Sequence, residues 1–245
     1  MTFDDAATGG SRTMASVLAD TILRDIVSGA LAPGSKLKIR ELADRYQASA
    51  IPLREAVSRL AMSGFVDAED QRGFRVTPVS RADLEDITSV RQCIESEALR
   101  DAMESGNLEW EASVLAAFHL VNSLPTVVDE PPRMNPDWER AHDHFHATLL
   151  AGCRSKWLKH FAATLRAQTA RYRHQSLRSQ HAGERDVGRE HEDIVKAVIA
   201  RDADRACELL REHFAATAKL VLEDAAPDGN AVPATRTGTG TRKRR

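Results

Sequence analysis

The sequence predicts a mainly α-helical protein with two domains, for three reasons. Its 245 residues are enough for two cores of ordinary size. Apolar side chains make up 42% of the chain and aromatic ones only 5%, and long stretches combine Ala, Leu, Arg and Glu, which favours helices. After Val76 apolar residues recur at helical spacing, and no segment alternates with the period of a strand. We therefore expect all strands to lie before residue 77.

Composition divides the chain into four segments. Residues 1–13 and 226–245 are small, polar and without apolar periodicity, so we expect both to be disordered. Residues 14–78 are predicted to form the first domain, and residues 79–225 an all-α antiparallel bundle. Its helices are expected at about 81–104, 108–123, 137–151, 156–178, 186–201 and 204–224. The proline-rich stretch 125–136 should connect two of them.

The first domain is predicted to contain a helix from Met14 to Gly29 and then two shorter helices. In the first short helix, apolar side chains recur at i, i+3, i+4 and i+7: Ile39, Leu42, Ala43 and Tyr46. The second should begin at Ser49, whose hydroxyl can cap the helix, and should end at Gly64. Pro52 falls in its first turn, where the missing N–H costs nothing.

A hairpin is expected after these helices, because residues 65–66 and 74–76 flank a polar turn at 69–73. This order of elements is that of a winged helix-turn-helix, whose second helix enters the major groove of DNA. Arg54 and Arg59 lie on the face of that helix that is not used for packing. The formal net charge is −2, so affinity for DNA must come from such a local patch. The alternative is an ordinary solvated face of a small helical domain.

Three motifs in this region resemble the GntR family of bacterial transcription regulators: PG-x-x-L-x-x-x-x-LA, S-x-x-P-L-R-E-A-V-x-R-L and G-F-x-V. They cover about a quarter of the chain. The resemblance implies a set of DNA-contacting residues: Arg40, Ser49 and Arg54, with Arg72 and Gly73 at the tip of the wing. Ala50 stands where many relatives have Arg, and Ile51 replaces the usual Thr, so we expect a different operator preference.

Four of the nine histidines form a candidate metal site. His142 and His146 lie at i, i+4 on one predicted helix, and His191 and His213 lie on two later helices. Inward-pointing imidazoles from three helices of a bundle can converge on a divalent ion, at about 2.0–2.1 Å. The alternative is a set of core or surface histidines hydrogen-bonded to their neighbours. Four others are expected to be of that kind: His144, His160, His174 and His181.

The C-terminal half resembles the ligand-sensing FCD domain of the FadR subfamily. The matching residues are Val90-Arg91-x-x-x-Glu95, Phe145-His146, Glu190-His191 and Leu210-x-x-His213-Phe214. In metal-binding relatives one Asp and three His coordinate the ion. The resemblance places His146, His191 and His213 on the three His positions. His142 falls on the Asp position, which is the main departure from the family pattern.

Imidazole in place of a carboxylate changes the expected site in two ways. A bound divalent ion keeps its full charge, so it should attract an anion more strongly. Ligation by nitrogen alone suits Zn²⁺, Ni²⁺ or Cu²⁺ better than Mn²⁺ or Mg²⁺, and zinc is the ion we expect, with nickel second. Asp143 could orient an imidazole by accepting its hydrogen bond. Alternatively, His142 ends metal binding, and the pocket recognises its ligand by hydrogen bonds alone.

The FCD resemblance also implies an effector, since relatives with this domain usually sense small organic acids. A carboxylate could occupy the open positions of the metal while Arg91 pairs with it; Arg171 and Arg173 are rival candidates. Arg91 could instead form only a salt bridge with Glu95, four residues later on the same helix.

These features predict a ligand-responsive, DNA-binding transcription regulator, in particular a repressor. It would act as a homodimer on a palindromic operator in double-stranded DNA. Two other interpretations stay open. One is a metal-dependent helical hydrolase with Asp143 or Glu190 as general base. The other is an architectural DNA-binding protein without an effector.

Cysteine use and hydropathy predict where the protein acts. The three cysteines are far apart in the sequence: Cys93, Cys153 and Cys207. They form neither a disulfide framework nor a C-x-x-C metal site, and this pattern fits a reducing compartment. No apolar run approaches the roughly 20 residues that span a bilayer. We therefore expect a cytoplasmic protein with no membrane partner.

Overall fold

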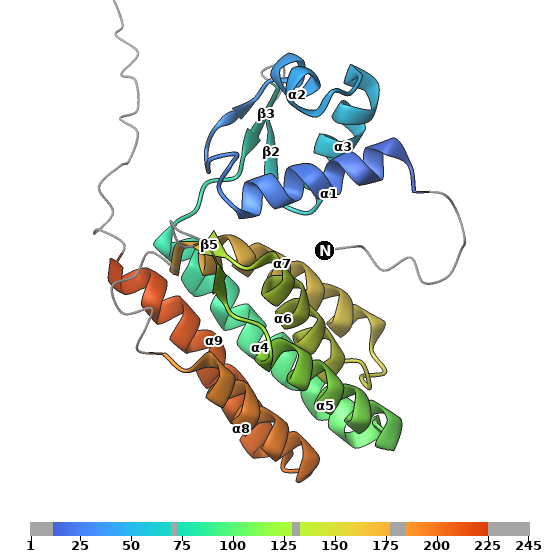
Figure 1. Cartoon of the computed structure of the whole chain (residues 1–245), viewed down its shortest axis with the longest axis vertical. Coiled ribbons are helices and arrows are strands. Elements are labelled where there is room, and N and C mark those ends of the chain that lie inside the picture. The colour runs from blue at the N-terminus through green and yellow to red at the C-terminus, as the bar shows by residue number, and fades with distance from the viewer. Residues whose placement is uncertain (1–11, 70–72, 129–132, 177–184, 225–245) are drawn as a thin grey trace, which may run out of the picture.

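The computed structural model describes residues 12–69, 73–128, 133–176 and 185–224, which fold into a small mixed domain above a helical one (Figure 1). Most of the two segments expected to be disordered, 1–13 and 226–245, lies outside the described residues. Within the first of them, Thr13 is ordered as a helix cap, because its hydroxyl accepts a hydrogen bond from the Ser16 backbone N–H at 3.2 Å.

The first domain is the winged helix-turn-helix that the sequence predicts. Its elements in chain order are α1 (Met14–Val27), β1 (Lys36–Leu37), α2 (Ile39–Tyr46), α3 (Ala50–Met62), β2 (Val66–Glu69) and β3 (Gly73–Val76). The strands form an antiparallel sheet in the order β1-β3-β2. Apolar side chains from all three helices and the wing close its core, among them Ile22, Leu42, Leu53, Val57 and Val76.

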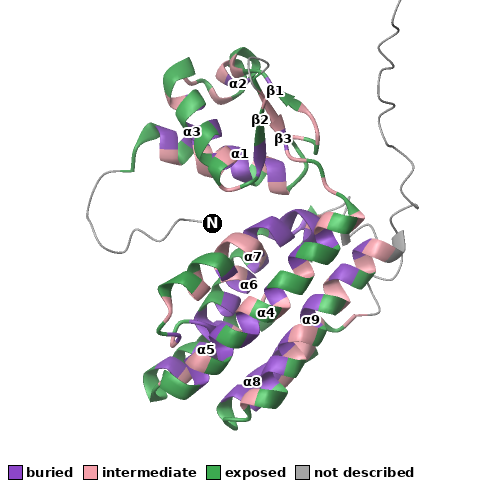
Figure 2. Ribbon diagram, turned by 180° about the vertical axis from the view of Figure 1, so that it is seen from behind, coloured by how far each residue is buried: buried purple, intermediate pink, exposed green. Residues whose placement is uncertain are grey.

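The second domain is a helical bundle, as predicted, with two short strands in one connection. Its helices are α4 (Arg81–Ser105), α5 (Leu108–Asn122), α6 (Pro136–Leu149), α7 (Lys156–Ser176), α8 (Val187–Ile199) and α9 (Ala203–Asp224). The long helix α4 packs against both α7 and α9. Buried residues follow the inward faces of these helices (Figure 2). No helix in the described part of the chain combines the length and the apolar character that crossing a membrane requires.

Three short strands were not expected from the sequence. The expectation that no strand follows Val76 is wrong, because β4 (Val127–Val128) and β5 (Arg133–Met134) pair antiparallel within the proline-rich connection. Likewise, β1 pairs with β3 beside the wing. Each of these strands has only two residues, which is too short to show a period-2 pattern. Their pairing is stabilised from outside the strands: for example, the Asn135 side chain donates to the Pro125 carbonyl at 2.8 Å.

Helix α7 joins the two domains. Ala167 belongs to the apolar core of the first domain, and the Gln168 side-chain amide donates to the Ser63 carbonyl at 2.6 Å. Gly64, at φ +77°, lies so close to this amide that a Cβ atom there would be 3.2 Å from the Gln168 nitrogen. The buried Arg171 guanidinium donates to the Thr77 carbonyl at 3.0 Å, where the chain leaves the wing. The winged helix-turn-helix domain therefore rests directly on a helix of the bundle.

Candidate functional site

Helix α3 presents Arg54 on its outward face. Leu53, Val57 and Leu60 are buried and fix which face of the helix points into the domain. Arg54 lies on the exposed face, and among the described residues its guanidinium makes no hydrogen bond or ion pair. A free, exposed guanidinium is well suited to donate two hydrogen bonds to the edge of a guanine base.

Some of the other basic residues near this helix form ion pairs within the protein, and others do not. Three of them are held in intramolecular ion pairs: Arg45 with Asp25 at 2.7 Å, Arg59 with Glu55 at 2.6 Å and Arg75 with Glu69 at 2.8 Å. Arg40, at the start of α2, is exposed and has no partner among the described residues. The basic surface without an intramolecular ion pair is therefore smaller than the sequence indicates, and it includes Arg40, Arg54 and the exposed Lys36.

Ser49 occupies the N-cap position of α3, but its side chain makes no capping hydrogen bond. The expectation that its hydroxyl caps the helix is therefore wrong, and the exposed hydroxyl remains available to a phosphate oxygen. At the wing, Gly73 is exposed and has φ +97°, a conformation that a side chain would strain. Arg72 lies outside the described residues.

Four imidazoles converge at the centre of the bundle. They come from α6, α8 and α9, they are all buried, and one ligand atom from each lies within 4.8 Å of the others: His142, His146, His191 and His213. We call this group the four-histidine cluster. The i, i+4 spacing explains why two of them share a face of α6. The packing of α8 against α9 brings the other two to the same place.

The buried imidazoles have too few hydrogen-bond partners. Among the described residues, neither ring nitrogen of His146 has a hydrogen-bond partner, nor does Nδ1 of His142 or Nε2 of His191. Burial lowers the pKa of these three imidazoles well below the ordinary histidine value, and the other imidazoles and nearby arginines lower it further. A neutral imidazole with a free lone pair is the form that binds metal. The cluster therefore fits a divalent ion. Coordination to the ion would offset the free-energy cost of burying ring nitrogens that have no hydrogen bond.

Glu190 and Arg185 orient one of the four rings. Nδ1 of His213 lies 2.7 Å from a Glu190 carboxylate oxygen, its shortest contact, which makes Nδ1–H the donor and leaves Nε2 for a metal. Arg185 donates two hydrogen bonds to the same carboxylate, at 2.7 and 2.6 Å. Burial by itself would raise the pKa of Glu190, but the hydrogen bonds from Arg185 and His213 lower it to about 2. The sequence names Glu190 as part of the FCD-like motif and as a candidate general base, but not as a group that orients His213, and nothing in the sequence singles out Arg185.

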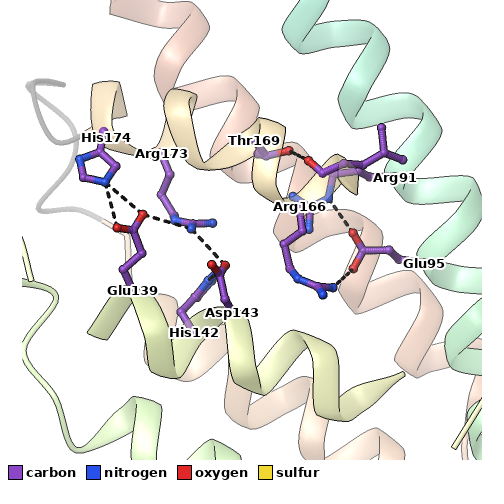
Figure 3. A network of polar contacts seen from close by, with 10 residues as sticks. Arg91, Glu95, Glu139, His142, Asp143, Arg166, Thr169, Arg173 and His174 are labelled. Atoms are coloured by element: carbon purple, nitrogen blue, oxygen red, sulfur yellow. Dashed lines mark hydrogen bonds and ion pairs between the residues drawn. The ribbon is translucent and has the colours of Figure 1, made fainter. Parts of the chain in front are cut away.

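The orienting role expected of Asp143 is not what the structure shows. Its carboxylate lies 3.9 Å from Nδ1 of His142, which is too far for a hydrogen bond. It lies 3.3 Å from the Arg173 guanidinium instead. Arg173 and His174 also contact Glu139, at 3.4 and 3.0 Å, so α7 holds α6 beside the cluster (Figure 3).

Arg91 is buried beside the cluster and is already paired. Its Nε donates to Glu95 at 2.7 Å, which is the salt bridge that the i, i+4 spacing allows. Its guanidinium also lies 3.9 Å from the centre of the Phe214 ring. The two rival candidates are turned elsewhere, because Arg171 contacts the inter-domain connection and Arg173 contacts α6. Arg91 and Arg173 thus both reach residues next to the cluster, Arg91 through Phe214 and Arg173 through Asp143, whereas Arg171 does not.

The metal-free protein is expected to lose stability as the pH falls below about 6.5. The unfolded chain protonates its imidazoles near that value, whereas burial keeps those of the four-histidine cluster neutral in the folded protein. Acid therefore favours the unfolded state, by up to about 1.4 kcal/mol per imidazole and pH unit, and above pH 6.5 these groups add no pH dependence. Urea unfolding of chelator-treated protein at about pH 5.5 and 7.5 measures this effect. Equal free energies of unfolding at the two values would contradict it.

Comparison with known proteins decides the family. Residues 14–76 match the "Bacterial regulatory proteins, gntR family", and residues 86–216 match the FCD domain. The chain belongs to the GntR family of bacterial regulators. It is 36% identical to an "Uncharacterized HTH-type transcriptional regulator BphR" of Paraburkholderia xenovorans, over 90% of this chain and 91% of that protein.

Other GntR relatives are similar over most of the chain. The "HTH-type transcriptional repressor GlaR" of Escherichia coli is 36% identical over 78% of this chain and 87% of its own length. Among solved structures, that of E. coli McbR/YncC superimposes with a TM-score of 0.71 at 18% identity, over 87% of this chain and 99% of the other, and so supports the fold. This GntR protein is therefore a DNA-binding transcription regulator and not an enzyme, and the hydrolase interpretation is set aside.

Proposed function

We propose that this GntR regulator is a repressor that binds a divalent metal ion in its FCD domain and senses a small carboxylate there. The observation that carries the proposal is the buried four-histidine cluster with its unsatisfied ring nitrogens. Repression is supported by the E. coli relatives GlaR and RspR, which are named transcriptional repressors. A regulator without an effector would leave these inward-facing polar rings without a purpose.

The four-histidine cluster would hold the metal ion, and the all-nitrogen ligand set favours zinc, with nickel second. Once bound, the ion would supply a Lewis-acidic attachment point for one carboxylate oxygen. The chain itself would position the rings, through the Glu190–Arg185 pair behind His213. It would also keep water out, because all four rings are buried.

We further propose that the protein acts as a cytoplasmic homodimer on a palindromic operator. Each chain offers one α3 helix with an outward Arg54, so two chains related by a twofold axis would present two such helices. Half-sites about one turn of DNA apart would then be read in the same way by the two helices.

Carboxylate binding is expected to stabilise the metal-loaded protein. A thermal-shift screen of small carboxylic acids, with and without chelator, should identify an acid that raises the melting temperature by several degrees, roughly the effect of binding well above Kd. The uncharged amides of the same acids are the matched controls. Zinc-loaded protein that responds to no acid would contradict a carboxylate sensor. A response that chelator leaves unchanged would indicate a metal-free pocket.

Ligand binding is expected to reach the DNA-binding domain through residues 171–174 of α7. Arg171 holds the inter-domain connection, while Arg173 and His174 hold the helix that carries two of the four histidines. Replacing Arg171 with glutamine should therefore reduce the change in DNA affinity that the effector causes, by up to about tenfold, while ligand binding is retained. Fluorescence anisotropy with labelled operator, with and without effector, measures this coupling.

A similar substitution controls for the loss of a charge on α7. Lys156→Gln changes an exposed residue at the other end of the helix and should leave the effector response intact. An unchanged response in Arg171→Gln would show that the signal takes another route.

A further inference from the structure

We infer that Ile51 is a specificity-determining residue, whose side chain contacts the 5-methyl group of a thymine close to the base that Arg54 contacts. The inference rests on the proposed role of α3 as the recognition helix and specifies one base of the operator. Ile51 is the second residue of α3, and it is 81% exposed. Apolar contact with a thymine methyl group is one of the ways in which proteins recognise sequence in the major groove.

The packing of α3 explains why Ile51 points outward. Leu53, Val57 and Leu60 bury the opposite face of the helix in the core of the domain. Single exposed apolar side chains are common on protein surfaces, so exposure alone does not indicate a ligand. The position of Ile51 does, because the first residues of the second helix are the ones that contact base edges in helix-turn-helix proteins.

Ile51 and Arg54 lie on one face of α3, since residues three apart in a helix are neighbours on its surface. Both are exposed. A helix rises by about 1.5 Å per residue, so the two residues are roughly 4.5 Å apart along its axis, and successive base pairs are about 3.4 Å apart. With Arg54 on a guanine, Ile51 would therefore reach one of the next two base pairs.

The following turn of the exposed face is held by contacts within the protein. Glu55 and Arg59 form an ion pair at 2.6 Å, and Arg59 also donates to the Ser16 hydroxyl of α1 at 2.9 Å. These two side chains are less available to bases than those at the start of the helix. Of the residues in the first turn, Ala50 has only a short methyl group, so Ile51 is the larger apolar side chain offered there.

The chemistry of the isoleucine side chain selects thymine. Ile51 stands where the GntR motif usually has Thr, and it offers no hydroxyl group, so its contacts are with apolar atoms. Thymine presents a methyl group in the major groove, whereas the other bases present amino donors and ring-nitrogen or carbonyl acceptors. Burying those polar atoms against an aliphatic side chain would remove their water without replacing its hydrogen bonds, which is unfavourable.

Replacement of thymine by uracil tests this inference, because uracil lacks only the 5-methyl group and pairs with adenine in the same way. We would footprint the full-length protein on its own promoter region and then place deoxyuridine at one symmetry-related pair of thymines at a time. Fluorescence anisotropy should show one pair whose replacement lowers the affinity by about tenfold, since each half-site loses one buried methyl group. Equal affinity for every substituted duplex would overturn the inference.

Variants of Ile51 test which side chain makes the contact. Ile51→Ala should bind the unmodified operator about tenfold more weakly than the parent protein and should no longer distinguish thymine from uracil at that pair. Ile51→Val keeps part of the side chain and should keep part of the discrimination. Both variants should melt at the temperature of the parent protein, because Ile51 is exposed. An Ile51→Ala protein with the full preference for thymine would overturn the assignment.

Met62→Ala is the matched control. Met62 is also apolar and is 84% exposed, but it is the last residue of α3, far from the first turn. This variant should bind like the parent protein and keep the preference for thymine, and loss of that preference would overturn the assignment to Ile51.

Arg54→Ala separates this inference from the assignment of the recognition helix. If Arg54→Ala weakens operator binding but no thymine is preferred over uracil, only the inference about Ile51 fails. If Arg54→Ala and Ile51→Ala both bind the operator like the parent protein, α3 is not the recognition helix, and both fail.

Discussion

Arg54→Ala is expected to weaken specific binding to the operator sharply while the protein stays folded. Arg54 is exposed on α3 and has no partner among the described residues, so its removal leaves the packing of the helix unchanged. A bidentate contact from arginine to a base is worth about 1–3 kcal/mol, and a dimer makes it twice. We therefore expect the affinity to fall by roughly thirtyfold or more, measured by gel shift with the protein's own promoter region.

Two controls separate the loss of the Arg54 contact from a general loss of charge and from unfolding. Arg205→Ala removes the same charge from the surface of the bundle, far from α3 in the sequence, and should leave operator binding unchanged. The melting temperature of Arg54→Ala should match that of the parent protein, because the side chain is exposed and makes no hydrogen bond or ion pair with the described residues. Full operator affinity in a folded Arg54→Ala protein would mean that α3 is not the recognition helix.

Removal of two cluster histidines is expected to abolish metal binding. His146→Ala/His191→Ala leaves two imidazoles, which are too few for a closed structural site or for a site of the usual three protein ligands. Elemental analysis should show zinc falling from about one equivalent per chain to background. His144→Ala is the matched control, because His144 lies on the same helix as His146 but is exposed to solvent. Equal zinc in the double variant and the control would refute the site.

The same variant is expected to lose the stabilisation that metal provides. Chelator should lower the melting temperature of the parent protein and of His144→Ala, but should leave that of the double variant unchanged. In the absence of metal, two opposing effects act on the variant. Truncation leaves a cavity, which destabilises the fold, but it also removes buried ring nitrogens that have no hydrogen bond, which stabilises it. We therefore expect only a small difference between the two metal-free proteins.

Much of the fold could be predicted because its signals are local. The apolar spacing of each helix and the Gly at the end of α3 act over a few residues. The two-residue strands could not be predicted, because their stability comes from partners and flanking hydrogen bonds rather than from their own pattern. Ser49 takes the predicted N-cap position, but its hydroxyl makes no capping hydrogen bond, because residue type alone does not fix the direction of a hydroxyl group.

By itself the sequence determined the helices, the winged motif, the outward position of Arg54 and the pairing of His142 with His146 on one face, since all of these follow from spacing along a single element. Only the tertiary structure decided which groups from different helices meet. It brought His191 and His213 to the first two histidines and placed Glu190 and Arg185 behind them. It also placed Arg45 and Arg75 in ion pairs with carboxylates of the same domain. Arg166 lies beside Glu95, but its Nη1 atom makes no hydrogen bond with a described residue. Hydrogen bonds and ion pairs act over a few ångströms, and residues far apart in the chain reach that distance only after the helices have packed.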